Sequence, residues 1–348
     1  MKKLLQNIII LPVILSGFIG CSSSEKATVE QITEDTDTRY MSATGSDFMR
    51  EELRKGVESV YRIQSSVGYR TYQFDLDDLP EKKDLVGSDL ELMAVDTMHD
   101  NNLSAGSAVV LSNSGGKTLL LTASHIVAFP DTIWHYAEGV PPGPQSKVEA
   151  VSINVSTSRT LIGHDGIYNF DIAVKDPSLD LALLVQDWGD NDRPDLVTLQ
   201  LETGRSDALN WTDQVFAVGY PLGIQMVTNA MISRPARSSR RNFAFDASIN
   251  RGFSGGAIFA KRGDGSGMEW VGVVSSASGV SEEYLVPERR RNREYHPDTE
   301  YDGSIYVQRS QRINYGIAYG VGIDQVRQFI RDHRHELRTL GISLTDYE

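Results

Sequence analysis

The segment 250–256, with the sequence Asn-Arg-Gly-Phe-Ser-Gly-Gly, places Ser254 between glycines and leads directly into an apolar run at 257–260. The apolar run predicts a β-strand, so the chain has to turn sharply from the serine into a sheet. Glycines permit such a turn and let another molecule approach the backbone closely. This kind of loop can present the hydroxyl to a carbonyl carbon and direct its N–H groups at the developing oxyanion. Taken alone, the segment is equally compatible with a turn that does no chemistry.

The Gly-x-Ser-x-Gly frame around Ser254 also fits the nucleophile elbow of α/β-hydrolases, in which the nucleophile, the acid and the base follow in that order. An esterase of that fold would therefore need its histidine after Ser254. The later histidines are His296 in a charged segment, and His333 and His335 in a predicted terminal helix. None of them follows a strand, as that fold requires, so the esterase alternative is disfavoured.

Short apolar or alternating segments recur along most of the chain, with turn residues between them. These segments are 61–74, 106–111, 118–122, 148–155, 171–174, 181–185, 214–218, 226–232, 257–260, 270–275 and 305–309. Such a pattern favours an all-β barrel or sandwich. A short helix is predicted after Ser46 or Asp47, and a second, with Asp324 placed to cap it, over 324–340. The segment 75–87 is predicted to be a charged surface loop.

Two upstream residues are candidates to activate the serine, because a serine hydroxyl needs an adjacent base and the base needs an orienting group. His125 stands at the end of the apolar segment 118–122. Asp180 immediately precedes the apolar segment 181–185, where a carboxylate needs a partner to offset its desolvation. Taken singly, His125 is also compatible with a structural histidine and Asp180 with a strand-end cap.

Four motifs follow one another along the chain. They are Leu-Thr-Ala-Ser-His-Ile-Val at 121–127, Asp-Leu-Ala-Leu-Leu at 180–184, Val-Gly-Tyr-Pro-Leu-Gly at 218–223, and the serine segment at 250–256. Together they resemble trypsin-like serine proteases, and they are most similar to the bacterial HtrA (Deg) branch. The resemblance covers roughly residues 50–335. It implies two packed six-stranded β-barrels, with His125 and Asp180 on the first barrel and Ser254 on the second.

By that resemblance, Ser254 attacks a peptide carbonyl, His125 takes and returns the proton, and Asp180 orients the imidazole. The backbone N–H groups of Gly252 and Ser254 would form the oxyanion hole. The implied activity is that of a serine endopeptidase acting on proteins or peptides, without a cofactor or a metal.

Two residues beside the expected oxyanion hole depart from the family pattern. Phe253 stands where a small polar residue, Asn or Asp, is usual, and Arg251 stands where HtrA proteins often have proline. HtrA relatives can hold this loop in an inactive form until a partner or substrate orders it. The alternative function is therefore a catalytically silent, protease-like module that binds peptides or partners.

The second barrel and the terminal helix should use up the residues after Gly256, so no peptide-binding PDZ domain is expected.

The resemblance also places a specificity pocket, with Ser248 at its base. Its wall would be formed by Ser275, Ser276 and Ala277. Small uncharged residues indicate a preference for small or medium apolar side chains over Lys or Arg. Alternatively, Ser275 could support Asp180 by a hydrogen bond.

An unusual insertion is expected at 279–312, and it contains the basic run Arg-Arg-Arg-Asn-Arg at 289–293. One interpretation is a lid or a contact site for an acidic partner. The other, which is favoured, is a solvated loop.

The N-terminal segment has the features of an export signal. Two lysines precede an apolar run at 8–15 that is too short to span a membrane, and small residues follow. The sequence Phe-Ile-Gly-Cys at 18–21 resembles a bacterial lipobox, in which Cys21 becomes the lipidated first residue and a membrane anchor. An ordinary signal peptide with a chance cysteine is the alternative. Residues 22–46, rich in Ser, Thr, Glu and Asp, predict a flexible tether.

The formal net charge of −13 favours solubility and disfavours nucleic acid as a partner. The predicted function is that of a lipid-anchored serine endopeptidase of the bacterial cell envelope, in protein quality control or processing. It would lie on the periplasmic face of the outer membrane if the host has one. HtrA relatives are often trimers, so the resemblance admits a homo-oligomer.

The predicted organisation is a signal peptide over 1–20, a tether over 21–46 and a protease domain over 47–340, with barrels at about 57–190 and 210–322 and a helix at 324–340.

Overall fold

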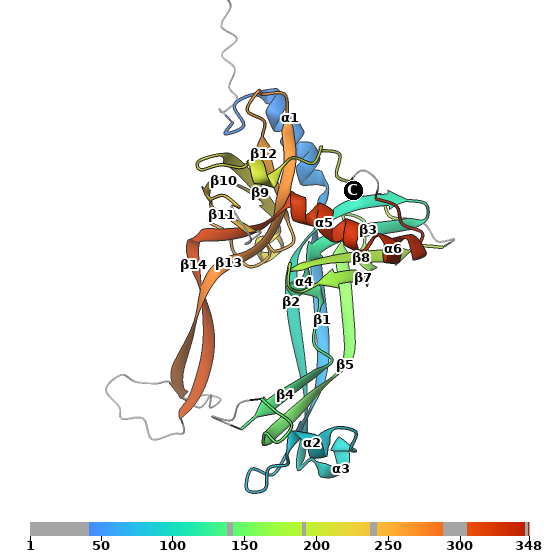
Figure 1. Cartoon of the computed structure of the whole chain (residues 1–348), viewed down its shortest axis with the longest axis vertical. Coiled ribbons are helices and arrows are strands. Elements are labelled where there is room, and N and C mark those ends of the chain that lie inside the picture. Colours follow the sequence, from blue (N-terminus) through green and yellow to red (C-terminus); the bar gives the residue numbers. More distant parts are fainter. Residues whose placement is uncertain are drawn as a thin grey trace, which may run out of the picture. The chain divides into compact units, whose positions relative to one another are not determined.

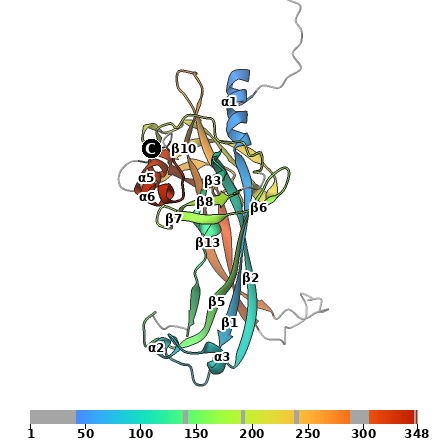
Figure 2. The same ribbon diagram turned by 90° about the vertical axis from the view of Figure 1, so that its right-hand side faces the viewer.

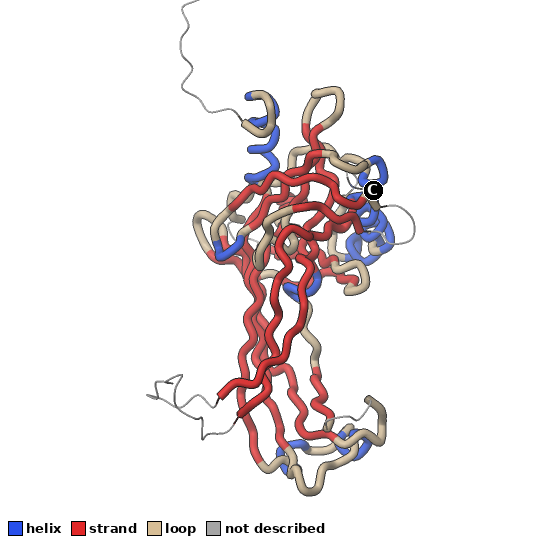
Figure 3. The backbone as a smooth tube through the Cα atoms, turned by 90° about the vertical axis from the view of Figure 1, so that its left-hand side faces the viewer, coloured by secondary structure: helices blue, strands red, loops and turns tan. Residues whose placement is uncertain are grey.

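The computed structural model describes residues 42–137, 142–189, 193–236, 242–287, 305–344 and 347. The predicted signal peptide, Cys21, most of the tether and the basic run 289–293 lie outside these residues. Strands dominate the described chain and its helices are short (Figure 3), so the all-β prediction is confirmed. Within the described residues, no helix is both long and apolar enough to cross a membrane.

The first β unit is an eight-stranded antiparallel sheet that does not close. Its strands are β1 (Val60–Gln73), β2 (Asp96–Ser114), β3 (Lys117–Ala123), β4 (Thr132–Tyr136), β5 (Val148–Ile162), β6 (Ile167–Asn169), β7 (Asp171–Asp176) and β8 (Leu181–Asp187). They pair in the order β4-β5-β1-β2-β3-β8-β7, and β6 joins β5.

The first unit differs from the predicted closed, six-stranded barrel in two ways: its sheet is not a closed ring of paired strands, and three of its strands are much longer than the others. β1, β2 and β5 run side by side well past β3, β8 and β7 (Figure 2). β4 pairs with the far end of β5, where Trp134 lies opposite Val151. At the other end of β5, β6 pairs with β5 and, after the single residue Phe170, β7 pairs with β8, so the segment 167–176 brings the two sides of the curled sheet together.

A small hydrophobic cluster fills the far end of the long strands, where the short helices α2 (Lys82–Leu85) and α3 (Leu90–Met93) lie (Figure 1). Leu85 is only 2% exposed and clusters with Phe74, Val148 and Val151. The predicted surface loop 75–87 therefore contains one short helix and one buried apolar residue, Leu85, whereas Leu76 and Val86 are exposed.

The second β unit is a closed barrel of six strands in the order β10-β11-β14-β13-β12-β9. The strands are β9 (Gln214–Gly219), β10 (Met226–Arg234), β11 (Asn242–Asp246), β12 (Ala257–Lys261), β13 (Met268–Pro287) and β14 (Ile305–Gly322). β13 and β14 continue beyond the barrel as a two-stranded ribbon (Figure 1), from Gly279 opposite Ile313 to Pro287 opposite Ile305. The described parts of the predicted 279–312 loop are therefore paired strands.

The N-terminal helix α1 (Asp47–Glu58) begins as predicted, because the hydroxyl of Ser46 accepts the N–H of Met49 at 3.2 Å. This bond satisfies one of the N–H groups that a helix leaves unpaired at its start. Leu53 and Gly56 are on its buried side.

The predicted terminal helix is divided in two, α5 (Ile323–Asp332) and α6 (Arg334–Thr339), with a break at His333. Asp324 does not cap α5. Its carboxylate accepts hydrogen bonds from the Ser206 hydroxyl at 2.6 Å and the Asp207 N–H at 3.0 Å, in the short 3₁₀ helix η1 (Ser206–Ala208). The carboxylate therefore holds α5 against the segment that enters the second barrel.

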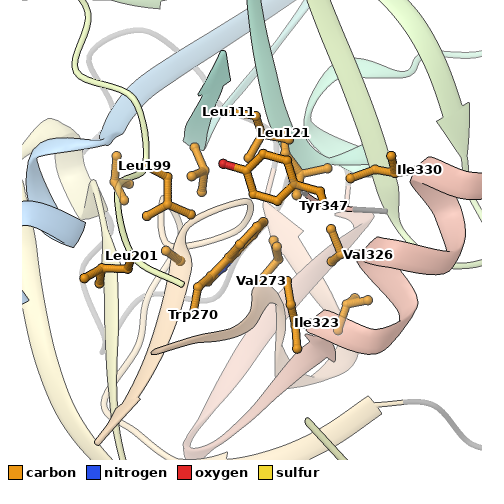
Figure 4. Packing of buried hydrophobic residues seen from close by; sticks show 14 of the residues in the cluster. Leu111, Leu121, Leu199, Leu201, Trp270, Val273, Ile323, Val326, Ile330 and Tyr347 are labelled. Atoms are coloured by element: carbon orange, nitrogen blue, oxygen red, sulfur yellow. The ribbon is translucent and has the colours of Figure 1, made fainter. Parts of the chain in front are cut away.

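A shared hydrophobic cluster joins the two β units, α5 and the C-terminal segment (Figure 4). Trp270 of β13 lies at its centre and is fully buried, and its indole N–H donates to the Gly272 carbonyl at 2.7 Å. The ring of Tyr347 meets the indole edge-on, with the ring centroids 5.9 Å apart. Leu121 of β3 contributes from the first unit and Val326 from α5. This cluster fixes the position of the two units that carry the candidate site.

We expect Trp270→Ala to lower the free energy of unfolding by about 3–5 kcal/mol, because it removes a large buried ring and leaves a cavity. Trp211→Ala is the matched control: Trp211 is 53% exposed, and its loss should change stability by less than about 0.5 kcal/mol. Denaturant unfolding followed by circular dichroism measures both values. Equal losses in the two variants would contradict the central role of Trp270.

Candidate active site

His125 is carried by α4 (Ser124–Val127), a single turn that begins where β3 ends. Ser124, Ile126 and Val127 are buried, whereas the His125 side chain is 46% exposed. The buried neighbours fix the turn against the sheet, and the imidazole is directed outward.

Asp180 ends the turn between β7 and β8. It has a backbone φ of +58°, a left-handed conformation that aspartate tolerates better than most residues. The turn is held by Asp176, whose carboxylate accepts the N–H groups of Ser178 at 2.8 Å and Leu179 at 3.2 Å. The Asp180 carbonyl accepts the N–H of Ser124 at 3.1 Å, so this turn is tied directly to α4.

The imidazole of His125 is hydrogen-bonded to the Asp180 carboxylate. Nδ1 lies 2.9 Å from each carboxylate oxygen, and the backbone N–H of His125 donates to Oδ1 at 3.0 Å. Because an ionised carboxylate only accepts, Nδ1 carries the proton in the neutral ring and Nε2 is left as the acceptor. A base with its lone pair on the outer nitrogen is what an adjacent hydroxyl requires.

The Asp180 carboxylate also accepts the hydroxyl of Ser275 at 2.6 Å. Burial raises the pKa of Asp180, but the hydrogen bonds and charge of His125 and the hydrogen bond from Ser275 outweigh it, so the net pKa lies below its usual value. Asp180 is therefore ionised at neutral pH. Of the two roles considered for Ser275, the structure shows the hydrogen bond to Asp180.

The other expected pocket residues are only partly described. Ser248 is exposed, between β11 and the serine loop, the name used here for residues 250–256. Ser276 and Ala277 belong to the paired part of β13, but their side chains lie outside the described part of the chain.

Two glycines let the serine loop approach its neighbours. Gly252 has a φ of +109°, and a Cβ there would lie 2.3 Å from the Tyr220 carbonyl oxygen. Gly255 has a φ of +82°, and its Cβ would lie 2.1 Å from the Ser107 oxygen and 2.9 Å from the Ala123 nitrogen. Since Ala123 leads into α4, this close packing brings the serine loop next to His125.

Within the described chain, the backbone N–H groups of Gly252 and Ser254 donate to no other group, and neither does that of Asn250. The N–H groups of the other loop residues are engaged; that of Gly255, for example, donates to Val274 O at 2.7 Å. The expected oxyanion donors are thus among the unengaged N–H groups. Across the described residues, no hydrogen bond joins the Ser254 hydroxyl to His125. In free enzymes such bonds are often long and tighten only when substrate binds.

Phe253 anchors the loop in the second barrel. Its side chain is 2% exposed and belongs to the hydrophobic cluster inside that barrel. A Cβ on Gly219 would lie only 2.7 Å from the Phe253 Cα, so the first glycine of the Gly-Tyr-Pro-Leu-Gly segment makes room for the aromatic residue. Arg251, the other departure from the family pattern, is exposed. The phenylalanine therefore stabilises the loop from the barrel side.

Ser107 of β2 holds the loop from the first unit, although it belongs to none of the sequence motifs. Its N–H donates to Ser254 O at 2.8 Å and its hydroxyl to Gly252 O at 2.7 Å, while the hydroxyl accepts the Tyr220 N–H at 2.9 Å. Its carbonyl accepts the Thr122 hydroxyl at 2.7 Å. Ser107 is fully buried. The sequence carries no signal for this role, because the partners in the second barrel are more than 100 residues away.

A comparison with family models matches residues 106–268 to the trypsin-like peptidase domain. The chain carries a trypsin-like peptidase domain. The matched range includes His125, Asp180 and Ser254, and the resemblance inferred from the motifs is confirmed at the level of the family. Among the described residues of the domain, no group of three or more His, Cys, Asp or Glu is placed to hold a metal ion.

The domain is also similar to the serine protease Do-like HtrA of Lactobacillus helveticus, with 30% identity over 190 residues. That alignment covers 52% of this chain and 38% of the relative, so the chain spans well under half of that protein. A solved structure of an HtrA-type protease with a tripeptide is 18% identical, with a TM-score of 0.44, and the match covers 82% of this chain and 63% of that one.

We expect Ser107→Ala to lower kcat/KM for peptide hydrolysis by about 10- to 100-fold, mainly through kcat, because it releases the carbonyl of Gly252 and disturbs the oxyanion donors. Affinity for a peptide aldehyde, which forms a tetrahedral adduct, should fall in parallel, while affinity for the matched peptide alcohol changes little.

Ser65→Ala is the control for this substitution. Ser65 is equally buried in the same sheet, and its hydroxyl has no hydrogen-bond partner among the described residues. This variant should keep full activity. A Ser107→Ala protein with unchanged kcat would show that Ser107 has no positioning role.

Proposed function

We propose that this protein is a serine endopeptidase in which Ser254 is the nucleophile, His125 the general base and Asp180 the orienting carboxylate. The observation that carries the proposal is the preformed His125–Asp180 pair beside a loop whose Gly252 and Ser254 N–H groups are unengaged. The similarity to a serine protease over about half of the chain supports the same reaction class.

In the proposed reaction, the Ser254 hydroxyl attacks the peptide carbonyl and Nε2 of His125 takes its proton. The tetrahedral oxyanion is stabilised by the N–H groups of Gly252 and Ser254, each worth about 3–4 kcal/mol in comparable sites. His125 then protonates the leaving amine, and an acyl-enzyme remains on Ser254. A water molecule, deprotonated by His125, hydrolyses that ester and restores the serine.

A non-catalytic module that binds peptides is the second candidate. The missing hydrogen bond between Ser254 and His125 is the observation in its favour. Against it stand the anchoring of Phe253 in the barrel and the contacts of Ser107, which hold the serine loop without any ligand. We therefore place the peptidase first.

A fluorophosphonate probe decides between the two candidates, because it reacts only with an activated serine. We expect it to label the wild type and Ser65→Ala, and to leave Ser254→Ala and His125→Ala unlabelled. Peptide hydrolysis should fall by more than about 10³-fold in both of the last two variants. A folded wild type that is not labelled would favour the binding module, and activity that survives His125→Ala would favour an esterase.

The substrate preference is part of the proposal. Ser248 is small, uncharged and exposed near the serine loop. A pocket built on it favours small or medium apolar side chains over Lys or Arg, because it offers no carboxylate to a cationic side chain.

We propose in addition that the protein is exported and anchored by a lipid on Cys21, and that it acts in protein quality control or processing in the cell envelope. The support is the lipobox-like sequence at 18–21 after a short apolar run. Ser22, in place of aspartate, is compatible with sorting to an outer membrane.

Cells fed radiolabelled palmitate should incorporate the label into the wild-type protein, which should partition into the detergent phase with the membranes. Cys21→Ser removes the only thiol to which the lipid can be attached. This variant should lose both the label and the membrane association, while Ser22→Ala should keep them. Label retained by Cys21→Ser would contradict the anchor.

A further inference from the structure

A cavity of about 290 Å³ lies beside the candidate active site, on the side of His125 and Asp180. Its remaining lining comes from the chain that follows α4, with Phe129 and Pro130, and from the end of β7 and the turn after it, with Lys175 and Pro177. Neither Ser254 nor Ser248 lines it. The cavity is therefore separate from the expected specificity pocket, although His125 of the candidate active site also lines it.

Lys175 is the only lysine or arginine among the described residues that line this cavity. It is exposed near the end of β7, where its backbone lies opposite Ala182, and it makes no ion pair with any described residue. Its ammonium group is therefore available to an incoming anion.

The acidic groups near Lys175 are already committed to other partners. Asp180 lines the same cavity, but its oxygens accept hydrogen bonds from His125 and Ser275. Asp176, the next residue along β7, accepts the hydroxyl and the N–H of Ser178 and closes the turn. Neither carboxylate needs Lys175 as a partner.

The rest of the lining is mostly apolar. Ala128, Phe129, Pro130 and Pro177 provide walls against which methylene groups can pack, and the lysine lies among them. A cavity that combines an apolar wall with one cation suits a side chain with a short aliphatic stem and a terminal carboxylate. Glutamate has this form and can pair with Lys175, whereas the other charged lining group, the Asp180 carboxylate, is already engaged by His125 and Ser275.

We propose that this cavity is a binding subsite for an acidic side chain, glutamate above all, of the polypeptide substrate, at a position near the scissile bond but not at it. The subsite rests on the proposed function in one respect: its occupant is a side chain of a polypeptide substrate that binds alongside His125. Lys175 then determines specificity without taking part in bond cleavage.

The test measures binding to the Ser254→Ala protein, so that it does not depend on cleavage. Fluorescent peptides of one host sequence carry a single glutamate at each position in turn, and the matched peptides carry glutamine there. We expect one position at which glutamate binds about fivefold more tightly than glutamine, with the difference shrinking at high salt. Fluorescence anisotropy gives both affinities.

Lys175→Met, added to Ser254→Ala, keeps an unbranched apolar side chain and removes the charge, so the preference for glutamate should disappear. Lys261→Met makes the same change in net charge at a residue that lines a different cavity, and it should leave the preference intact. Lys175→Glu should reverse the preference in favour of lysine-containing peptides.

The subsite is disproved if no position favours glutamate, if no peptide binds, or if the preference survives Lys175→Met. The failure of the proposed function has a different signature. A wild type that cleaves none of the peptides, while Ser254→Ala still prefers glutamate through Lys175, would remove the peptidase and leave the subsite. If the wild type cleaves the peptides but Ser254→Ala binds the glutamate and glutamine peptides equally, the subsite is disproved and the peptidase proposal stands.

Discussion

The hydrogen bonds of Ser107 are the contacts on which the candidate site depends, because its parts lie on two separate β units. His125 and Asp180 belong to the open sheet, whereas Ser254 follows β11 of the closed barrel. Ser107 joins them by donating to Ser254 O and Gly252 O from a fully buried position. Buried hydrogen bonds of this kind are costly to break, since a lost partner leaves a polar group unsatisfied. The cluster around Trp270 adds the apolar contact area that keeps the units together.

The orientation of His125 follows from a second constraint, the partial burial of the Asp180 carboxylate, whose side chain is 21% exposed. A carboxylate at this depth is stable as an anion only when donors surround it, and His125 and Ser275 supply them. The same bonds fix the imidazole with its Nδ1 proton toward Asp180. A structural requirement of the turn before β8 thus sets the geometry that a general base needs.

Phe253, one of the two departures from the family pattern, holds the serine loop in place. The small polar residue usual at that position would leave the loop to be held by hydrogen bonds, whereas the buried ring of Phe253 is packed inside the second barrel. Apolar packing does not depend on pH or on a charged partner, so the loop keeps its shape through contacts within the domain. Gly219 permits this arrangement, because a side chain there would collide with Phe253.

The sequence by itself determined the elements with a strong local signal: the alternating strands, the start of α1 at Ser46, the order of His125, Asp180 and Ser254, and the glycines around the serine. Tertiary structure decided the rest. The extension of β1, β2 and β5 beyond β3, β8 and β7 has no local signal in the sequence, and the break at His333 has no proline or glycine to announce it. Ser107, Ser275 and Lys175 acquire their surroundings from segments distant in the chain, and a periodicity or a motif records only near neighbours.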